Sequence, residues 1–331
     1  MKNQSTNKAA RRKILCLISM LPFIGFNQFA RADTFPSKPI TLIVPFTAGA
    51  GTDIIARSIA EKMQKLVGQP VIVDNRPGAA GVIGTNFVAK APRDGYTLLF
   101  TPNSFSFANL ISGNPKQNYD PVSSFDPVIE VGTTPMFLVT GEQSGMNTFE
   151  QALAAAKKNP ASYGSAGTGS ILHLVGELVN QSTGINLTHV PYKGTSQAMV
   201  DVLGGQIPYA YGALSTVDPY IKTGKLKILA TTGSQRTALA PEVPTLAEKG
   251  YKDVNLSAWY GIFAPKGTNP AAISLLNSNL NQILKMPAII EAMRSQGTIA
   301  TGGSADRLAA TNANDVATLQ SLVKKLNLSE K

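Results

Sequence analysis

Two glycine-rich loops contain the residue types best suited to chemistry in this sequence. The first lies in VPFTAGAGTDIIAR, residues 44–57, and the second is GSAGTGS, residues 164–170. Each loop follows an apolar, strand-like run and precedes a segment with helical periodicity. A helix N-terminus that follows such a loop presents backbone N–H groups and the positive end of the helix dipole. Each loop therefore predicts either a site for a carboxylate or phosphate, or only a tight turn.

Neither loop matches a nucleotide-binding motif. The dinucleotide pattern G-x-G-x-x-G fails because Ile54 and Leu172 stand where the third glycine is required. The Gly-Lys-Ser/Thr sequence of a P-loop is also absent from both loops. We therefore expect no cofactor.

The residues that could act in catalysis do not form a known catalytic motif. Ser165 lies in Gly-Ser-Ala-Gly, which is not the G-x-S-x-G nucleophile elbow. His173, in the helix after the second loop, could line a cleft or pack, and His189 is interpreted as a hydrogen-bonded core residue of a strand. The single cysteine, Cys16, lies near the N-terminus, and no H-x-x-x-H pair occurs. We expect no catalytic residue and no metal site, although an exported hydrolase of a small anion remains the alternative.

The first 32 residues have the pattern of a targeting segment. A basic region is followed by an apolar run over residues 14–26 and by Ala30-Arg31-Ala32, which fits a small-x-small cleavage site. The apolar run is shorter than the roughly 20 residues of a membrane-spanning helix. We therefore expect export to the periplasm and cleavage near Ala32. Arg11-Arg12 leaves the twin-arginine route open beside the general secretory route.

The charge balance changes when this segment is removed. The full chain of 331 residues has a net charge of +10, but the first 32 residues hold six basic and no acidic residues. The remainder has 24 basic and 20 acidic residues, a net charge of +4. No dense cluster of lysine and arginine remains, so we expect no nucleic-acid partner. A mild positive excess suits a small anionic ligand.

The elements that must position the loops alternate between strands and helices in both halves of the chain. This order predicts α/β units with parallel strands and helices on both faces of each sheet. A second unit begins near residues 126–130, and Thr52 or Asp53 is expected to cap the first helix. The expected strands are 40–46, 70–74, 95–100, 136–140, 162–166, 187–191, 209–213 and 227–232. One helix is expected to start after residue 53, and the other expected helices cover 82–91, 148–158, 171–183, 196–203, 270–285 and 305–326.

Several segments, in this order and spacing, are typical of one family. From about Phe35 to Leu326 the chain resembles the extracytoplasmic receptors of tripartite tricarboxylate transporters, the Bug-type solute-binding proteins. The segments that carry the resemblance include PSKPITLIVPFTAGAGTDIIAR, GQPVIVDNRPGAAGVIGTNFVAKAPRDGYTLL, YGSAGTGSILHLVGELVNQSTGINLTHVPYKG, VDVLGGQI, GKLKILATTGSQRT and EVPTLAEKG followed by WYGIFAPKGTNP.

The resemblance implies a two-lobe periplasmic binding protein of type II, a Venus-flytrap fold with mixed, mostly parallel sheets and flanking helices. The expected divisions are a leader over residues 1–32, a first lobe over 33–130 and 253–331, and a second lobe over 131–252. It also implies a monomeric receptor, not an enzyme, that delivers a di- or tricarboxylate, an acidic amino acid or an aromatic acid to membrane permease subunits. A ligand-sensing partner of a membrane kinase would share the fold and is a further alternative.

The resemblance places the ligand between the two loops, with the loop after residue 102 and the turn after residue 191 as neighbours. The family usually has adjacent glycines where this chain has Gly49-Ala50-Gly51, so the methyl group of Ala50 would narrow the pocket or alter the approach of the backbone. The expected ligand-binding residues are Phe46, Thr47, Ala48, Gly49, Ala50, Gly51, Thr52, Asp53, Asn103, Ser104, Ser165, Ala166, Gly167, Thr168, Gly169, Ser170, His173, Tyr192 and Lys193.

Overall fold

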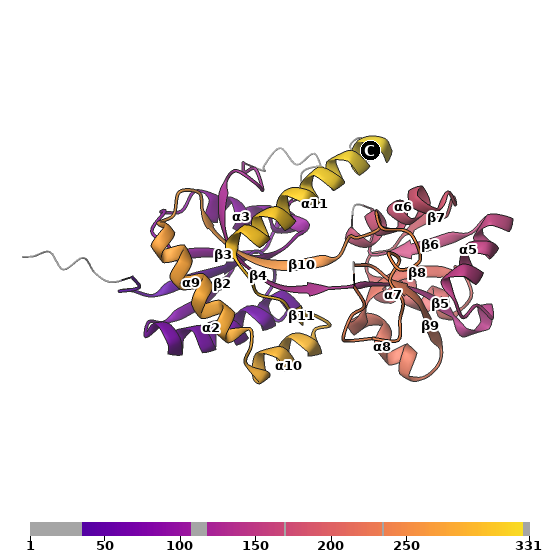
Figure 1. Cartoon of the computed structure of the whole chain (residues 1–331), viewed down its shortest axis with the longest axis horizontal. Coiled ribbons are helices and arrows are strands. Elements are labelled where there is room, and N and C mark those ends of the chain that lie inside the picture. The colour runs from indigo at the N-terminus through magenta and orange to yellow at the C-terminus, as the bar shows by residue number, and fades with distance from the viewer. Residues whose placement is uncertain (1–34, 107–117, 169, 234, 327–331) are drawn as a thin grey trace, which may run out of the picture. The chain divides into compact units, whose positions relative to one another are not determined.

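The chain forms two β-sheets, each flanked by helices (Figure 1). This computed structural model describes residues 35–106, 118–168, 170–233 and 235–326. The predicted leader, residues 1–32, and the predicted site residue Gly169 lie outside the described residues. We call each sheet together with its helices a lobe, and the expected two-lobe α/β fold is confirmed.

The first sheet has the strand order β11-β4-β10-β3-β1-β2. Strand β1 pairs in parallel with β2 and β3, as the alternating pattern predicts, whereas β10 pairs antiparallel with β3 and β4. The antiparallel share is therefore larger than the sequence suggested. The strands are β1 (Ile40–Val44), β2 (Val71–Asn75), β3 (Thr97–Pro102), β4 (Phe125–Thr134), β10 (Ala258–Pro265) and β11 (Ile299–Ala300).

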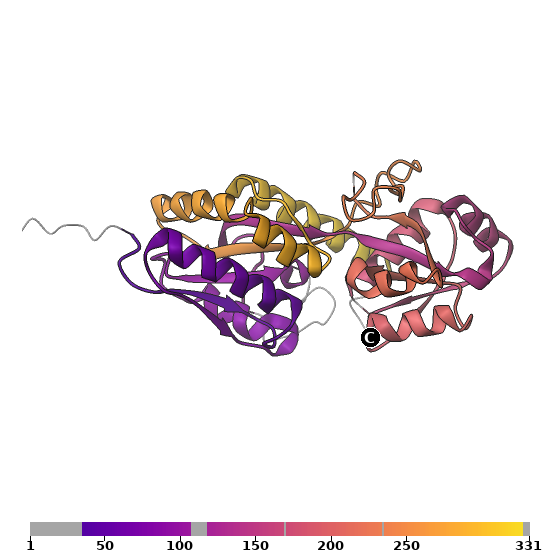
Figure 2. The same cartoon turned by 90° about the horizontal axis from the view of Figure 1, so that it is seen from below.

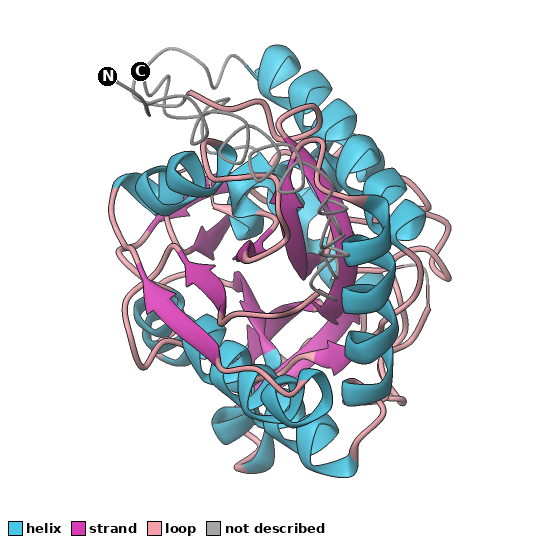
Figure 3. Cartoon of the chain, turned by 90° about the vertical axis from the view of Figure 1, so that its left-hand side faces the viewer, coloured by secondary structure: helices cyan, strands magenta, loops and turns pink. Residues whose placement is uncertain are grey.

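Helices cover both faces of the first sheet because β1 alternates its buried side chains. Ile40 and Leu42 pack with Ile55 of α2 in one cluster, and Ile43 packs with Val82 of α3 in another. Figure 3 shows helices on the outer sides of the strands. No helix within the described ranges is both long and apolar enough to cross a membrane. The helices of this lobe are α2 (Gly51–Val67), the 3-10 turn η1 (Ala79–Gly81), α3 (Val82–Ala89), α9 (Pro270–Ile283), α10 (Pro287–Ser295) and α11 (Ala305–Leu326).

The second sheet has the strand order β7-β6-β8-β5-β9, with β6 parallel to β7 and β8 and β5 antiparallel to β8 and β9. Phe137 packs with Met199 of α7 on one face, and Leu138 packs with Leu174 of α6 on the other. The elements are β5 (Met136–Gly141), η2 (Glu142–Ser144), α5 (Phe149–Lys158), β6 (Ser162–Ser165), α6 (Ile171–Thr183), β7 (Thr188–Pro191), α7 (Thr195–Leu203), β8 (Tyr209–Ala213), α8 (Leu214–Lys222) and β9 (Leu226–Thr231).

The chain passes between the sheets twice. The expected start of the second unit near residues 126–130 is wrong, because β4 pairs within the first sheet. Only Pro135 separates β4 from β5 of the second sheet (Figure 2). The chain returns through the segment that leads into β10. Helix α11 contributes Leu308 to a cluster of the first lobe and Leu319 to a cluster of the second. The two lobes are thus joined by both crossing segments and by this helix.

Candidate functional site

The first loop ends in a helix N-terminus without a side-chain cap. Gly49 adopts a left-handed backbone conformation with φ +81°, and Ala50 is the N-cap residue of α2. The expected cap at Thr52 or Asp53 is wrong, because both residues lie in the first turn of the helix. Within the described part of the chain, the backbone N–H groups of Gly51 and Thr52 have no hydrogen-bond acceptor. This helix start therefore offers free donors and a positive dipole to an anion.

The methyl group of Ala50 causes no strain in this loop. Its backbone is extended, with φ −70° and ψ 159°, a conformation that any L-residue adopts. A side chain would be restricted instead at Gly51, where an added Cβ would lie 3.2 Å from Oε1 of Gln296. The departure from adjacent glycines is thus compatible with the loop conformation.

Asp53 holds the first loop together. Its buried carboxylate accepts hydrogen bonds from the backbone N–H of Gly49 at 2.8 Å, from Nε of Arg57 at 3.0 Å and from Nδ2 of Asn75 at 2.9 Å. Asn75 also donates to the carbonyl oxygen of Phe46 at 3.1 Å. Burial alone would raise the pKa of Asp53, but the hydrogen bonds from Arg57, Gly49 and Asn75 outweigh it and hold the pKa below its usual range. The carboxylate is therefore ionised and positions the loop.

The second loop is organised around the buried hydroxyl of Ser165. This Oγ donates to the carbonyl oxygen of Gly167 at 3.1 Å, accepts from the N–H of Gly167 at 3.1 Å and lies 2.7 Å from Nε2 of His189. Gly167 has φ +114°, a region that other L-residues rarely adopt. Ser170 caps α6 by accepting from the N–H of His173 at 3.2 Å.

His189 is hydrogen-bonded within a strand, as expected, but it is half-buried rather than part of the core, and its bond to Ser165 supports this loop. Its half-buried ring stacks on the ring of His173, with 3.9 Å between centroids and 22° between planes. The hydroxyl of Tyr163, whose ring lies 5.1 Å from that of His189, is 2.7 Å from Oε1 of Glu177 and 3.1 Å from the carbonyl oxygen of His173. Burial lowers the pKa of both imidazoles to about 4, so both rings are neutral at pH 7.

The neutral histidine pair predicts a loss of stability in mild acid. Between pH 6.5 and about 4 the unfolded chain takes up protons at His173 and His189 that the native rings do not. The free energy of unfolding should therefore decrease as the pH falls through this window, by at most about 1.4 kcal/mol per pH unit for each histidine. Urea unfolding at pH 7.0, 5.5 and 4.5 measures the slope.

A matched variant distinguishes the contribution of these imidazoles to the pH dependence of stability from that of the carboxylates. His189→Gln keeps a polar partner for Ser165 but does not titrate, so its slope should be smaller than that of the wild type. Equal slopes in the two proteins would contradict the assignment of the acid sensitivity to the pair.

The remaining expected site residues vary in their availability. Asn103 is buried and donates through Nδ2 to the carbonyl oxygen of Ser257 at 3.0 Å and to Asp315 at 3.2 Å, so its amide joins elements of the fold. Tyr192 donates its hydroxyl to Asp201 at 2.6 Å, and its backbone lies beside the second loop. Thr47, Ala48, Gly49, Thr168 and Lys193 are exposed; Phe46, Ala50, Gly51, Ser104, Ala166, Gly167, Ser170 and Tyr192 are half-buried; and Thr52, Asp53, Asn103, Ser165 and His173 are buried.

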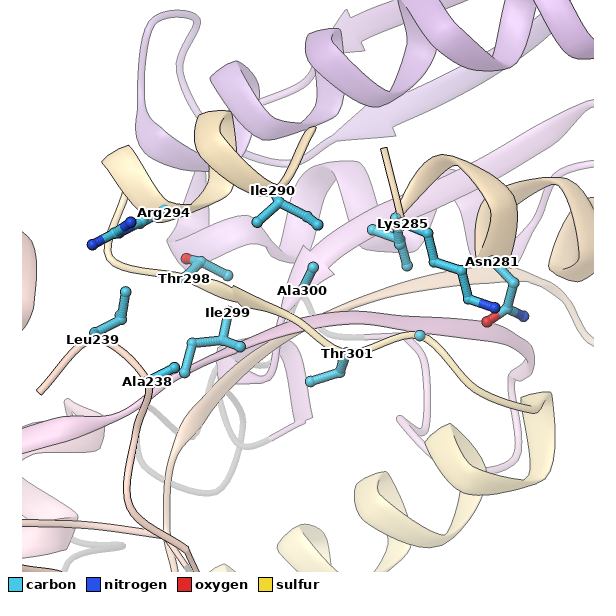
Figure 4. Close-up of a pocket in the computed structure, with 12 residues that line it drawn as sticks. Ala238, Leu239, Asn281, Lys285, Ile290, Arg294, Thr298, Ile299, Ala300 and Thr301 are labelled. Carbon is cyan, nitrogen blue, oxygen red and sulfur yellow. The ribbon is translucent and has the colours of Figure 1, made fainter. Parts of the chain in front are cut away.

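A cavity that the sequence did not indicate is lined by residues outside both loops. It has a volume of about 560 Å³ and is bordered by α10, β11 and residues 238 and 239 (Figure 4). None of the expected ligand-binding residues lines it. No motif could have revealed this cavity, because it forms only where residues 281–302 meet residues 238 and 239 of a separate segment.

Comparison with known proteins identifies the family. The profile described as "Tripartite tricarboxylate transporter family receptor" matches residues 55–328. The chain belongs to this receptor family. BugT of Bordetella pertussis is 40% identical over 275 residues, which cover 82% of this chain and 84% of BugT.

Solved structures agree with this tripartite tricarboxylate receptor assignment. A TctC solute-binding protein from Polaromonas has a TM-score of 0.82 and 31% identity, with 88% of this chain and 100% of that chain covered. The R. palustris protein Rpa4515, solved with adipate, has a TM-score of 0.70 and 30% identity, covering 88% and 97% of the two chains. The chain is therefore a solute-binding receptor with the fold of this family, and the resemblance seen in the sequence is confirmed.

Proposed function

We propose that this receptor captures a small carboxylate with the two glycine-rich loops and delivers it to a membrane permease. The observation that carries the proposal is the uncapped start of α2, where Asp53 fixes a loop that presents free N–H groups. The adipate-bound relative supports a carboxylate as the ligand class. The second loop, with Ser170 at the start of α6, would complete the site from the other lobe.

Lobe closure would follow from this arrangement. We propose that residues 33–130 with 253–331 and residues 131–252 act as the two lobes, and that the crossing segments that precede β5 and β10 act as the hinge. A ligand that contacts both loops gains interactions only when the lobes close, so it shifts the population toward the closed form. We further propose that the monomeric receptor works in the periplasm after cleavage near Ala32.

The buried state of Ser165 favours a receptor over a hydrolase. Its side chain is 0% exposed, and its hydroxyl is engaged with Gly167 and His189. A nucleophile must reach the substrate carbonyl carbon, which this position does not permit without rearrangement of the loop. His173, the expected partner of Ser165, contacts His189 instead.

A thermal-shift comparison tests the ligand class. At a concentration of 100 times its Kd, a ligand stabilises the native state by about 2.7 kcal/mol and should raise Tm by a few degrees. We expect adipate or another small carboxylate to produce this shift with the mature chain. Adipamide has the same length but no charge, so it is the matched control and should leave Tm unchanged. A shift with a neutral sugar or a nucleotide, and with no carboxylate, would contradict the proposal.

A further inference from the structure

The cavity beside β11 has walls from both lobes. One wall consists of the end of α9, helix α10 and strand β11, which belong to the first lobe. The other wall is Ala238 and Leu239, in the segment that follows β9 and is tied to it by the bridge between Thr231 and Thr245. A second cavity of about 570 Å³ adjoins it and shares Ala238, Ile299 and Thr301. The volume is in the range of small-molecule sites.

The lining combines an apolar floor with two available cations. Ile290 is 45% exposed, and Leu239 and Ile299 lie beside it. The side chains of Lys285 and Arg294 are exposed and have no hydrogen bond or ion pair within the described ranges. Figure 4 shows these two cations at opposite ends of the cavity, with Ile290 and Ala300 between them. No aspartate or glutamate lines the cavity.

The acidic residues of the adjoining cavity are occupied by other partners. Glu130 is buried and contacts Nη2 of Arg307 at 3.3 Å, and Asp315 accepts from Nε1 of Trp259 at 2.7 Å. Neither carboxylate therefore neutralises Lys285 or Arg294. The unpaired positive charges next to apolar side chains have the chemistry of a site for an anion with an apolar body.

We propose that this cavity is a second binding site, for an organic anion with an apolar body, separate from the glycine-rich loops. Lys285 or Arg294, at either end of the cavity, would hold an anionic group, and Ile290 with Leu239 would cover the apolar part. Because the walls belong to different lobes, a movement of one lobe relative to the other must change the shape and volume of the cavity. If the closure in the proposed function is correct, this site is linked to carboxylate capture, and each ligand changes the affinity of the other by the same factor.

The probe for this site is 8-anilinonaphthalene-1-sulfonate, which carries one sulfonate on an aromatic skeleton. Titration of the mature chain should show a saturable rise in fluorescence that persists in excess adipate. The variant Lys285→Gln/Arg294→Gln should bind the probe at least about 10-fold more weakly. The control Lys158→Gln/Lys252→Gln removes the same charge from exposed positions outside the cavity and should bind like the wild type.

The outcomes separate this inference from the proposed function. Equal probe affinity in the cavity variant and the wild type, or no saturable binding by the wild type, would overturn the second site. Full displacement of the probe by adipate with no effect of the cavity variant would place the probe at the loops and also overturn it. A wild type that binds the probe through Lys285 and Arg294 but no carboxylate would retain this site while contradicting the proposed function.

Discussion

Replacement of Gly167 by valine is expected to weaken carboxylate binding by about 100-fold or more, equivalent to about 2.7 kcal/mol. Gly167 has φ +114°, which a β-branched residue cannot adopt without strain, and a Cβ would lie 3.2 Å from the carbonyl oxygen of Tyr192. The loop would have to move, and both hydrogen bonds between Gly167 and Ser165 would be lost. Calorimetric titration with adipate measures the effect.

Gly184→Val is the matched control for this substitution. Gly184 also has a positive φ, +70°, but it lies at the far end of α6 and a Cβ there would meet no atom within 4 Å. Its strain should lower stability without changing the affinity. Unchanged affinity in Gly167→Val would remove the second loop from the site, and equal losses in both variants would indicate a general effect on folding.

Replacement of Asp53 by alanine is expected to lower both stability and affinity. The substitution removes the shared acceptor of Gly49, Arg57 and Asn75, and with it the hydrogen bonds that fix the loop. Because Gly49 and Arg57 can bond to water after the substitution, we expect a loss of about 1.5–3 kcal/mol, the range for a hydrogen bond to a charged group. Urea unfolding gives the stability, and calorimetry with adipate gives the affinity.

Two further variants sharpen the test of Asp53. Asp53→Asn keeps one carbonyl acceptor without the charge, so its losses should be intermediate. Asp218→Ala breaks the exposed ion pair with Lys222 and should cost less than about 1 kcal/mol, with no change in affinity. If Asp53→Ala unfolds with the same free energy as the wild type, the carboxylate does not hold the loop.

Local signals in the sequence were sufficient for several elements near the site. The helix over 171–183 was predicted with its observed bounds, since Ser170 caps its start and Gly184 ends it in the left-handed conformation. The strand 209–213 also agrees with the structure. By contrast, α8 was not predicted, because its N-cap Ala213 makes no side-chain cap and Pro219 lies within it.

The side-chain organisation of the site could not be read from local patterns. The contact between Asp53 and Asn75 and that between Ser165 and His189 join residues on different elements, and their distances depend on strand order. His189 was therefore interpreted as a core residue from its apolar neighbours alone. The family could be recognised from ordered motifs, but the residues that choose one carboxylate over another depend on the depth of each loop.

The bond between Trp259 and Asp315 has a practical consequence. Trp259 is the single tryptophan of the sequence, it lies at the start of β10 just after the crossing segment, and its indole N–H donates to a carboxylate of α11 at 2.7 Å. The fluorescence of an indole depends on nearby charge and hydration, so a change in this hydrogen bond would alter the wavelength and intensity of the emission. The protein thus contains a native optical reporter at the junction of its lobes, and its motion could be followed in real time by stopped-flow mixing without any attached dye.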